Sequence, residues 1–279
     1  MKKLLLALPI VVTLLGGNLT AQTKTQGGNS GMYISVHGGY NLPMGTQNIS
    51  FFDFYNETSQ NGPNKFDDIL LSLGKGANFG LTVGHMFNQN LGAEIRADYL
   101  LGSKYNAQYR DPSDAAYTWD TYLSGKMIQL KPSLVFKQHY NKISPYAKVG
   151  LVFGVGSKIT YEQKGLDNNF SYNYVQELDG GTAIGLTGAL GIDYPINNKI
   201  SVFGEVNGTS LNYAPKKGKV TEWTEDGVDQ IPGKTVRQLQ SEFLDEFTDN
   251  NDPNSPAKYQ RQPMPFSSIG LNLGLKFNF

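Results

Sequence analysis

The sequence contains no cysteine, which rules out disulfide bonds and the cysteine-linked lipid anchor that some exported proteins carry. Its 24 basic and 24 acidic residues leave a formal net charge of zero, so nucleic-acid binding has no electrostatic support. Only three histidines are present, without a G-x-S-x-G, H-E-x-x-H or paired metal-ligand motif. The sequence therefore predicts no catalytic residue, no metal site and no cofactor.

Long apolar runs are also missing. Residues 4–15 form one apolar segment, which is shorter than the roughly 20 residues that a membrane-spanning helix needs. A basic start precedes this segment and small or polar residues follow it, as in a secretory signal peptide. We expect cleavage after Ala21, so that residues 1–21 are the signal peptide and residues 22–279 form the mature chain. If that chain resides in a membrane, it must cross it with strands.

Glycine and aromatic residues are abundant: the chain has 32 Gly, 16 Tyr and 15 Phe, a mixture typical of twisted sheets with aromatic edges. The last eleven residues, 269–279, alternate strictly. Their odd positions are Ile, Leu, Leu, Leu, Phe and Phe, and their even positions are Gly, Asn, Gly, Lys and Asn. A period of two over about ten residues predicts an extended strand long enough to cross a membrane when tilted.

Seven other segments repeat this alternation, which gives eight predicted strands in all. The other seven are residues 32–40, 78–87, 91–99, 126–137, 146–159, 182–194 and a strand that begins at residue 200. Short turns at 88–90, 139–142 and 196–199 alternate with long polar connections at about 41–75, 110–125, 162–179 and 214–264. Short turns at one rim and long loops at the other are typical of outer-membrane barrels, whose short turns lie in the periplasm.

A soluble sandwich or a lipocalin-like barrel is the alternative for eight alternating strands. The export signal, the alternation of loop lengths and the terminal Phe279 favour the membrane barrel. We therefore predict an all-β fold: an eight-stranded antiparallel transmembrane β-barrel with short periplasmic turns and long extracellular loops.

The strand pattern and the terminal Gly270-Leu-Asn-Leu-Gly-Leu-Lys-Phe-Asn-Phe279 resemble the OmpA/OmpX-type outer-membrane β-barrel domain family. The resemblance covers essentially the whole mature chain, although it rests on patterns and no peptidoglycan-binding domain follows the last strand. It implies the outer membrane of a diderm bacterium, with outer-membrane lipid and the barrel-assembly machinery as partners. It also implies that Phe279 is the assembly signal.

Charged residues occupy the predicted inward positions of several strands. Eight strands enclose a space that side chains just fill, so buried charges should pair across the lumen. We expect Lys131 to meet one of the charged residues of 94–98, and Glu205 to meet Lys276; His37 is a further inward candidate. The predicted polar network comprises Glu94, Arg96, Asp98, Lys131, Lys148, Glu205 and Lys276. A plugged barrel is the favoured interpretation, and a narrow channel or small-solute porin is the alternative.

A lipid-modifying outer-membrane enzyme is the third possibility. Such enzymes use a histidine together with Ser, Asp or Glu near the outer rim. Here only His37 is predicted to point inward, and no serine and carboxylate accompany it at a recognisable spacing. We therefore predict a non-enzymatic surface protein whose extracellular loops bind an unidentified ligand or stabilise the envelope.

The loops contain three notable segments. Phe51, Phe52, Phe54 and Tyr55 form an aromatic cluster, which is a candidate surface contact or packs over the barrel mouth. The spacing of Val236, Leu239, Phe243, Leu244 and Phe247 predicts one face of a short helix. Residues 249–252 resemble a calcium loop in composition only, and a solvated turn is expected.

Aromatic residues on the lipid-facing parity predict girdles at both membrane interfaces. Those expected near the short-turn rim are Phe87, Phe136, Tyr194, Phe277 and Phe279, and those expected near the outer rim are Tyr40 and Tyr99.

Overall fold

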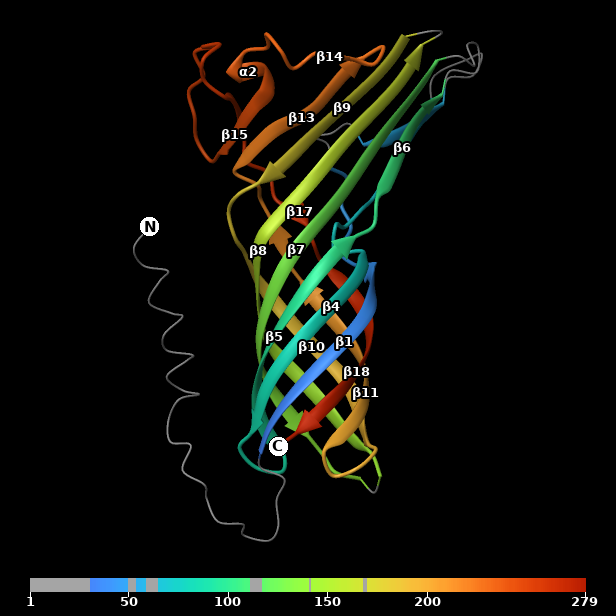
Figure 1. Ribbon diagram of the computed structural model, residues 1–279, viewed down its shortest axis with the longest axis vertical. Coiled ribbons are helices and arrows are strands. Elements are labelled where there is room, and N and C mark those ends of the chain that lie inside the picture. Colours follow the sequence, from blue (N-terminus) through green and yellow to red (C-terminus); the bar gives the residue numbers. More distant parts are fainter. Residues whose placement is uncertain (1–30, 50–53, 59–64, 111–116, 141, 168–169) are drawn as a thin grey trace.

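The computed structural model describes residues 31–49, 54–58, 65–110, 117–140, 142–167 and 170–279. The predicted signal peptide, Phe51 and Phe52 lie outside these residues. Figure 1 shows a tall barrel whose strands continue at one end into a broad sheet.

Eight strands form a closed antiparallel barrel. They are β1 (Gly31–Pro43), β4 (Gly76–Met86), β5 (Leu91–Gly102), β7 (Thr118–Lys137), β8 (Ser144–Asp167), β10 (Ala183–Pro195), β11 (Ile200–Ser210) and β18 (Ser268–Asn278). Each strand pairs with the next in this order, and β18 pairs back with β1. The predicted eight-stranded antiparallel barrel is confirmed.

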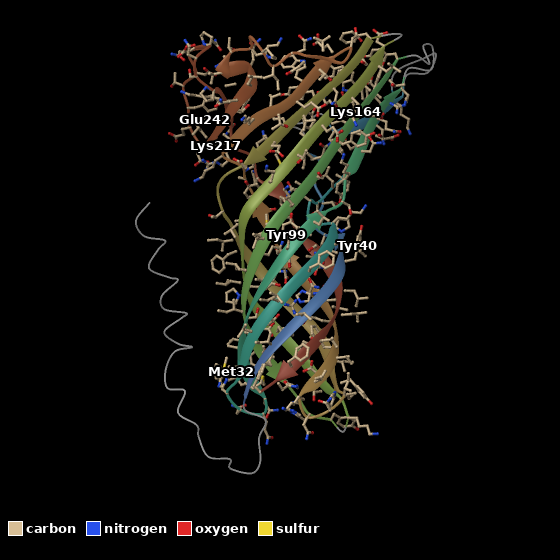
Figure 2. All side chains as sticks on the ribbon, in the orientation of Figure 1. Met32, Tyr40, Tyr99, Lys164, Lys217 and Glu242 are labelled. Carbon is tan, nitrogen blue, oxygen red and sulfur yellow. The ribbon has the colours of Figure 1, made fainter. Side chains whose placement is uncertain are left out.

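The period-two alternation separates the two faces of the barrel wall. On β18 the side chain of Leu273 is 64% exposed, whereas that of Asn272 is 1% exposed. All seven predicted girdle aromatics are exposed on the outer surface. Figure 2 shows Met32 at the short-turn end of the barrel, with Tyr40 and Tyr99 near the opposite end of its wall. A band of apolar side chains therefore surrounds the barrel between these two levels.

The connections at the long-loop end are largely strands rather than irregular loops. Strands β7 and β8 are 20 and 24 residues long, so both extend well past the ends predicted from the sequence. The strands that continue this sheet are β2 (Tyr55–Thr58), β3 (Lys65–Asp68), β6 (Tyr105–Arg110), β9 (Phe170–Asp179), β13 (Lys217–Glu225), β14 (Val228–Asp229), β15 (Gln240–Leu244) and β16 (Ala257–Gln260). We call these strands, with the upper parts of β7 and β8, the protruding sheet. The polar composition of these segments suggested loops. Polar segments can also form strands, because pairing with neighbouring strands satisfies the backbone hydrogen-bonding groups.

A bulge separates the barrel part of β8 from its upper part. The register between β7 and β8 shifts between Lys126 and Ile128, and Gly156 has a φ of +59° that favours glycine. The shift reverses the parity of β8, so that Gly154 is buried below the bulge and Ile159 above it. Pro132 on β7 causes no shift, because the register is the same on either side of it.

The helix predicted over residues 236–247 is wrong beyond its first turn. Helix α2 (Val236–Leu239) has four residues, with a capping box between Thr235 and Gln238. The following residues form β15, which pairs with β13 and β16, so sheet pairing overrides the helical spacing. As a result Phe243 is buried while Phe247 is exposed. Within the described ranges, no helix is long and apolar enough to cross a membrane.

Candidate functional site

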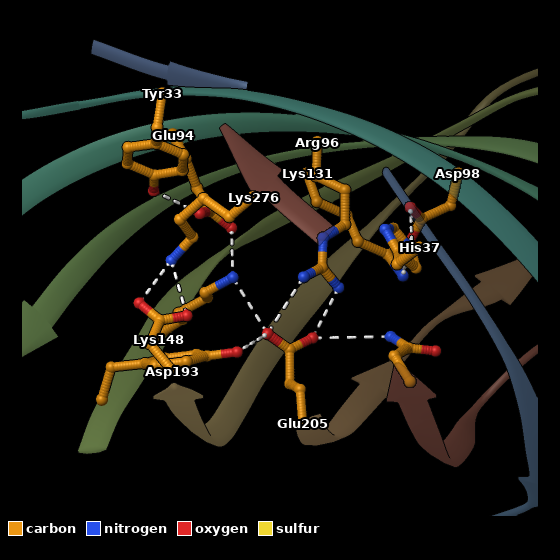
Figure 3. Close-up of polar contacts among 12 residues, drawn as sticks. Tyr33, His37, Glu94, Arg96, Asp98, Lys131, Lys148, Asp193, Glu205 and Lys276 are labelled. Atoms are coloured by element: carbon orange, nitrogen blue, oxygen red, sulfur yellow. Dashed lines mark hydrogen bonds and ion pairs between the residues drawn. The ribbon is translucent and has the colours of Figure 1, made fainter. Parts of the chain in front are cut away.

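The barrel interior is crossed by a bidentate ion pair. Arg96 on β5 donates two hydrogen bonds to Glu205 on β11, from Nη1 to Oε1 at 2.7 Å and from Nη2 to Oε2 at 3.0 Å. In the order of the barrel, three strands separate β5 from β11 in either direction. The pair therefore spans the full width of the lumen, as the close-up in Figure 3 shows.

Lys148 on β8 joins this pair to a second carboxylate. Its Nζ lies 2.8 Å from Oε1 of Glu94 and 2.9 Å from Oε2 of Glu205. Two tyrosine hydroxyls complete the cluster: Tyr33 donates to Glu94 at 2.6 Å and Tyr146 donates to Glu205 at 3.1 Å. These charge-assisted hydrogen bonds compensate the loss of water around the buried carboxylates.

The expected pairing of Glu205 with Lys276 is wrong. Lys276 on β18 binds Asp193 on β10, with Nζ 2.8 Å from Oδ1 and 2.6 Å from Oδ2. Lys137 on β7 reaches the same carboxylate at 2.8 Å. Asp193 is not among the residues of the predicted network. Its inward parity was the available signal, whereas the choice between two carboxylates depends on the geometry of the closed barrel.

The third group of charges lies closer to the long-loop end. Lys131 contacts Asp98 at 2.9 Å, so Asp98 is its partner among the residues of 94–98 considered. His37 lies on the other side of the same carboxylate, with Nε2 3.2 Å from Oδ1. The structure thus places all seven residues of the predicted polar network inside the barrel. They form three groups of interacting charges, and Asp193 belongs to one of these groups.

These groups fill the middle of the lumen. Four carboxylates (Glu94, Asp98, Asp193 and Glu205) face four cations whose side chains are also buried (Arg96, Lys131, Lys148 and Lys276), and Lys137 lies at the rim. A void of about 10 Å³ beside the Arg96 group has room for at most one water molecule. Below the network, a vestibule of about 1010 Å³ opens at the short-turn end and reaches Asp193 and Lys276.

The upper lumen is apolar, which the predicted polar inward parity did not indicate. The largest fully buried side chains are Phe54, Leu71, Leu73, Leu100, Leu123, Met127, Ile159, Leu178, Leu211, Tyr213, Met264 and Phe266. We call this group the cap. Phe54, a candidate surface contact in the sequence analysis, is fully buried here, so packing was its correct assignment. Tyr55 is half-buried and lies edge-to-face against Phe66 at 5.4 Å.

Two chain segments far apart in sequence form the cap together. The amide of Leu73 donates to the carbonyl of Pro265 at 2.8 Å, and the hydroxyl of Ser72 donates to the carbonyl of Ser267 at 2.6 Å. Gly74 permits this approach, because a Cβ there would meet the carbonyl of Phe266. The long connections that follow β1 and β11 therefore close the mouth of the barrel.

Aromatic rings follow one face of the protruding sheet above the cap. Trp119 on β7 stacks on Tyr172 of β9 at 5.1 Å, and Trp223 of β13 meets Tyr174 edge-to-face at 5.8 Å. Burial raises the pKa of Tyr174 to about 12. These cross-strand contacts stabilise the protruding sheet.

Ion pairs cover the opposite face of the protruding sheet and its outlying segment. Glu162 accepts from Lys104 at 2.6 Å and lies 2.8 Å from Lys164; burial raises its pKa, but hydrogen bonds from both lysines lower it overall. Arg237 donates two hydrogen bonds to Asp249, at 2.8 and 2.7 Å, which lower the pKa of that carboxyl. In the part of the chain that the structure describes, no cluster of three metal-ligating side chains occurs.

Comparison with known proteins gives one family match. The family described as outer membrane protein beta-barrel domain matches residues 11–229. No curated protein matches the sequence. Among solved structures, Neisserial surface protein A is 9% identical, with a TM-score of 0.40 over 91% of this chain and 100% of that chain. Ail, the attachment invasion locus protein of Yersinia pestis, is also 9% identical, with a TM-score of 0.31 over 90% of this chain and 99% of that chain. Because both TM-scores lie below 0.5, neither likeness bears on function.

Proposed function

Since the chain belongs to the outer membrane protein β-barrel domain family, we propose that it is a non-enzymatic surface protein whose closed barrel anchors a binding sheet outside the cell. The observation that carries this proposal is the continuity of β7 and β8. Both strands run without interruption from the barrel wall into the protruding sheet. A ligand bound there would be held by a platform that is continuous with the membrane anchor.

The interior favours an anchor over a channel. The Arg96–Glu205 pair crosses the lumen, and the cap closes the end nearer the protruding sheet. An ion passing through would have to displace paired charges and then enter an apolar layer, and both steps are costly.

The same closure disfavours catalysis. His37 is buried beside Asp98, and both side chains lie within the packed lumen. His85 is on the barrel wall and His139 follows β7 at the short-turn end. A substrate approaching from outside the cell would meet the cap before it reached His37.

A shortened variant tests the proposal. Tyr161 and Gln176 are direct partners in β8 and β9, so residues 162–175 can be replaced by an Asn-Gly turn without changing the register. We expect cells carrying this variant to lose adhesion to a panel of immobilised matrix proteins and glycans, while the barrel remains folded and cells keep their resistance to detergent. Equal adhesion of cells with the native protein, with the variant and with neither would refute the binding role.

Conductance provides the second measurement. The native protein in a planar lipid bilayer is expected to give no stable open current. A steady current that persists over many openings would favour the channel and exclude the closed anchor.

A further inference from the structure

Two lysines mark the upper limit of the lipid-facing surface on neighbouring strands. The outward column of β7 rises through Leu134 and Ile128, which are exposed and apolar, and its next outward residue is Lys126. The outward column of β8 rises through Val149 and Leu151 and, after the bulge, reaches Lys158. The change from apolar to cationic therefore occurs at the same level on both strands.

The two lysines are direct cross-strand partners. Lys126 is paired with Lys158 in the register of β7 and β8. Both side chains point outward, because Met127 and Ile159, the residues that follow them, are fully buried. Directly opposed side chains have Cβ atoms about 5 Å apart, and like charges in this arrangement destabilise a sheet.

In the part of the chain that the structure describes, only one of these two lysines has an anionic partner. Lys158 contacts Glu177 at 2.6 Å, whereas Lys126 is exposed and makes no ion pair within the described residues. The outward residues next to Lys126 at this level do not supply an anion, since its partner on β5 is Leu101. Further along the same row, Lys158 stands opposite Asp179 on β9, and Lys217 on β13 stands between Asp179 and Glu242. Figure 2 labels Lys217 and Glu242 at the base of the protruding sheet.

We propose that Lys126 and Lys158 bind a phosphate of an outer-leaflet lipid. The height fits a headgroup, because the outward residues below both lysines are exposed and apolar, as on a surface that faces acyl chains. The charge fits a phosphate, since one anion between two opposed ammonium groups removes their repulsion and supplies the partner that Lys126 lacks. A flexible lysine can also extend its ammonium group toward the headgroups while its stem remains on apolar surface.

Native mass spectrometry of the full chain, purified in neutral detergent, tests this site. The probe is bis-phosphorylated lipid A, compared with the same lipid after removal of its phosphates. Each lysine near a charged membrane surface contributes about fivefold in affinity, so Lys126→Ala with Lys158→Ala should weaken adducts with phosphorylated lipid A about 25-fold. The native preference for phosphorylated over dephosphorylated lipid should disappear in this variant.

The matched control removes two lysines from the other end of the barrel. Lys142 and Lys199 are exposed near the short turns, and Lys142→Ala with Lys199→Ala makes the same change in net charge. This control should retain native binding. Equal loss in both double variants, or no loss in the Lys126 and Lys158 variant, would overturn the proposal.

A further arm separates lipid from free anion. Inorganic phosphate at millimolar concentration should not displace the lipid, because it lacks the acyl chains that contact Leu101 and Ile128. Displacement by inorganic phosphate would identify a general anion site and overturn the assignment to lipid.

Discussion

The indole of Trp119 lies over Gly165, its direct cross-strand partner on β8. A Cβ at position 165 would meet Cε3 and Cζ3 of the indole. The glycine thus leaves room for the ring to reach across β8 and stack on Tyr172 of β9. The absence of a side chain at Gly165 therefore allows a ring contact that spans three strands of the protruding sheet.

Gly165→Ala should therefore displace Trp119 and loosen the protruding sheet without unfolding the barrel. Loss of the stacked contact should cost about 1 kcal/mol locally. Hydrogen exchange at the upper amides of β7 and β8 should become faster, and the tryptophan emission should shift to longer wavelength. Gly208→Ala is the control, because a Cβ there meets nothing within 4 Å. Unchanged exchange in the Gly165 variant would show that the ring does not depend on this glycine.

Arg96 and Glu205 should be energetically coupled across the lumen. Arg96→Met leaves Glu205 buried with Lys148 as its remaining cation and should lower the free energy of unfolding by about 3 kcal/mol. The double variant Arg96→Met with Glu205→Met should be less destabilised than the sum of the two single variants, by about 1–3 kcal/mol. Urea unfolding in lipid vesicles measures both. Strict additivity would contradict a direct pair across the lumen.

The two partners of the Asp193 group should respond unequally to substitution. Asp193→Asn leaves Lys276 buried without its carboxylate, whereas Lys276→Met leaves Asp193 still bound to Lys137. We expect the first variant to lose about 3 kcal/mol and the second about 1 kcal/mol. Urea unfolding in lipid vesicles shows which variant loses more free energy of unfolding. A larger loss for Lys276→Met would mean that Asp193, and not Lys276, is the group that depends on the pair.

Removing an aromatic ring from the cap should destabilise the protein but not open it. Phe266 is fully buried and meets Tyr213 edge-to-face at 5.8 Å. Phe266→Ala should cost about 3–5 kcal/mol, because it leaves a cavity among packed rings. Bilayer recordings should still show no stable current, since the ion-paired layer below is intact. Steady conductance in this variant would mean that the cap alone closes the lumen.

Much of the barrel could be predicted because alternation along a strand has a period of two. This period assigns Asn272 to the lumen and Leu273 to lipid from the sequence alone, and the structure agrees. The period of two did not predict the bulge at Gly156. This bulge reverses the parity of β8 and places Ile159 inside the barrel. Polar composition likewise did not distinguish a loop from the solvent-exposed strand β9, because both expose polar side chains.

The sequence by itself determined the number of barrel strands and the inward face of the charged side chains that form the lumen network, and it predicts an export signal at the amino terminus. Only the tertiary structure decided which charges meet. Closure of the barrel brings β5 opposite β11, so Arg96 binds Glu205 across 109 residues, while Lys276 binds Asp193 instead. Alternation is local and can be read along one strand. The pairing of charges depends on the stagger of all eight strands, which no single segment encodes.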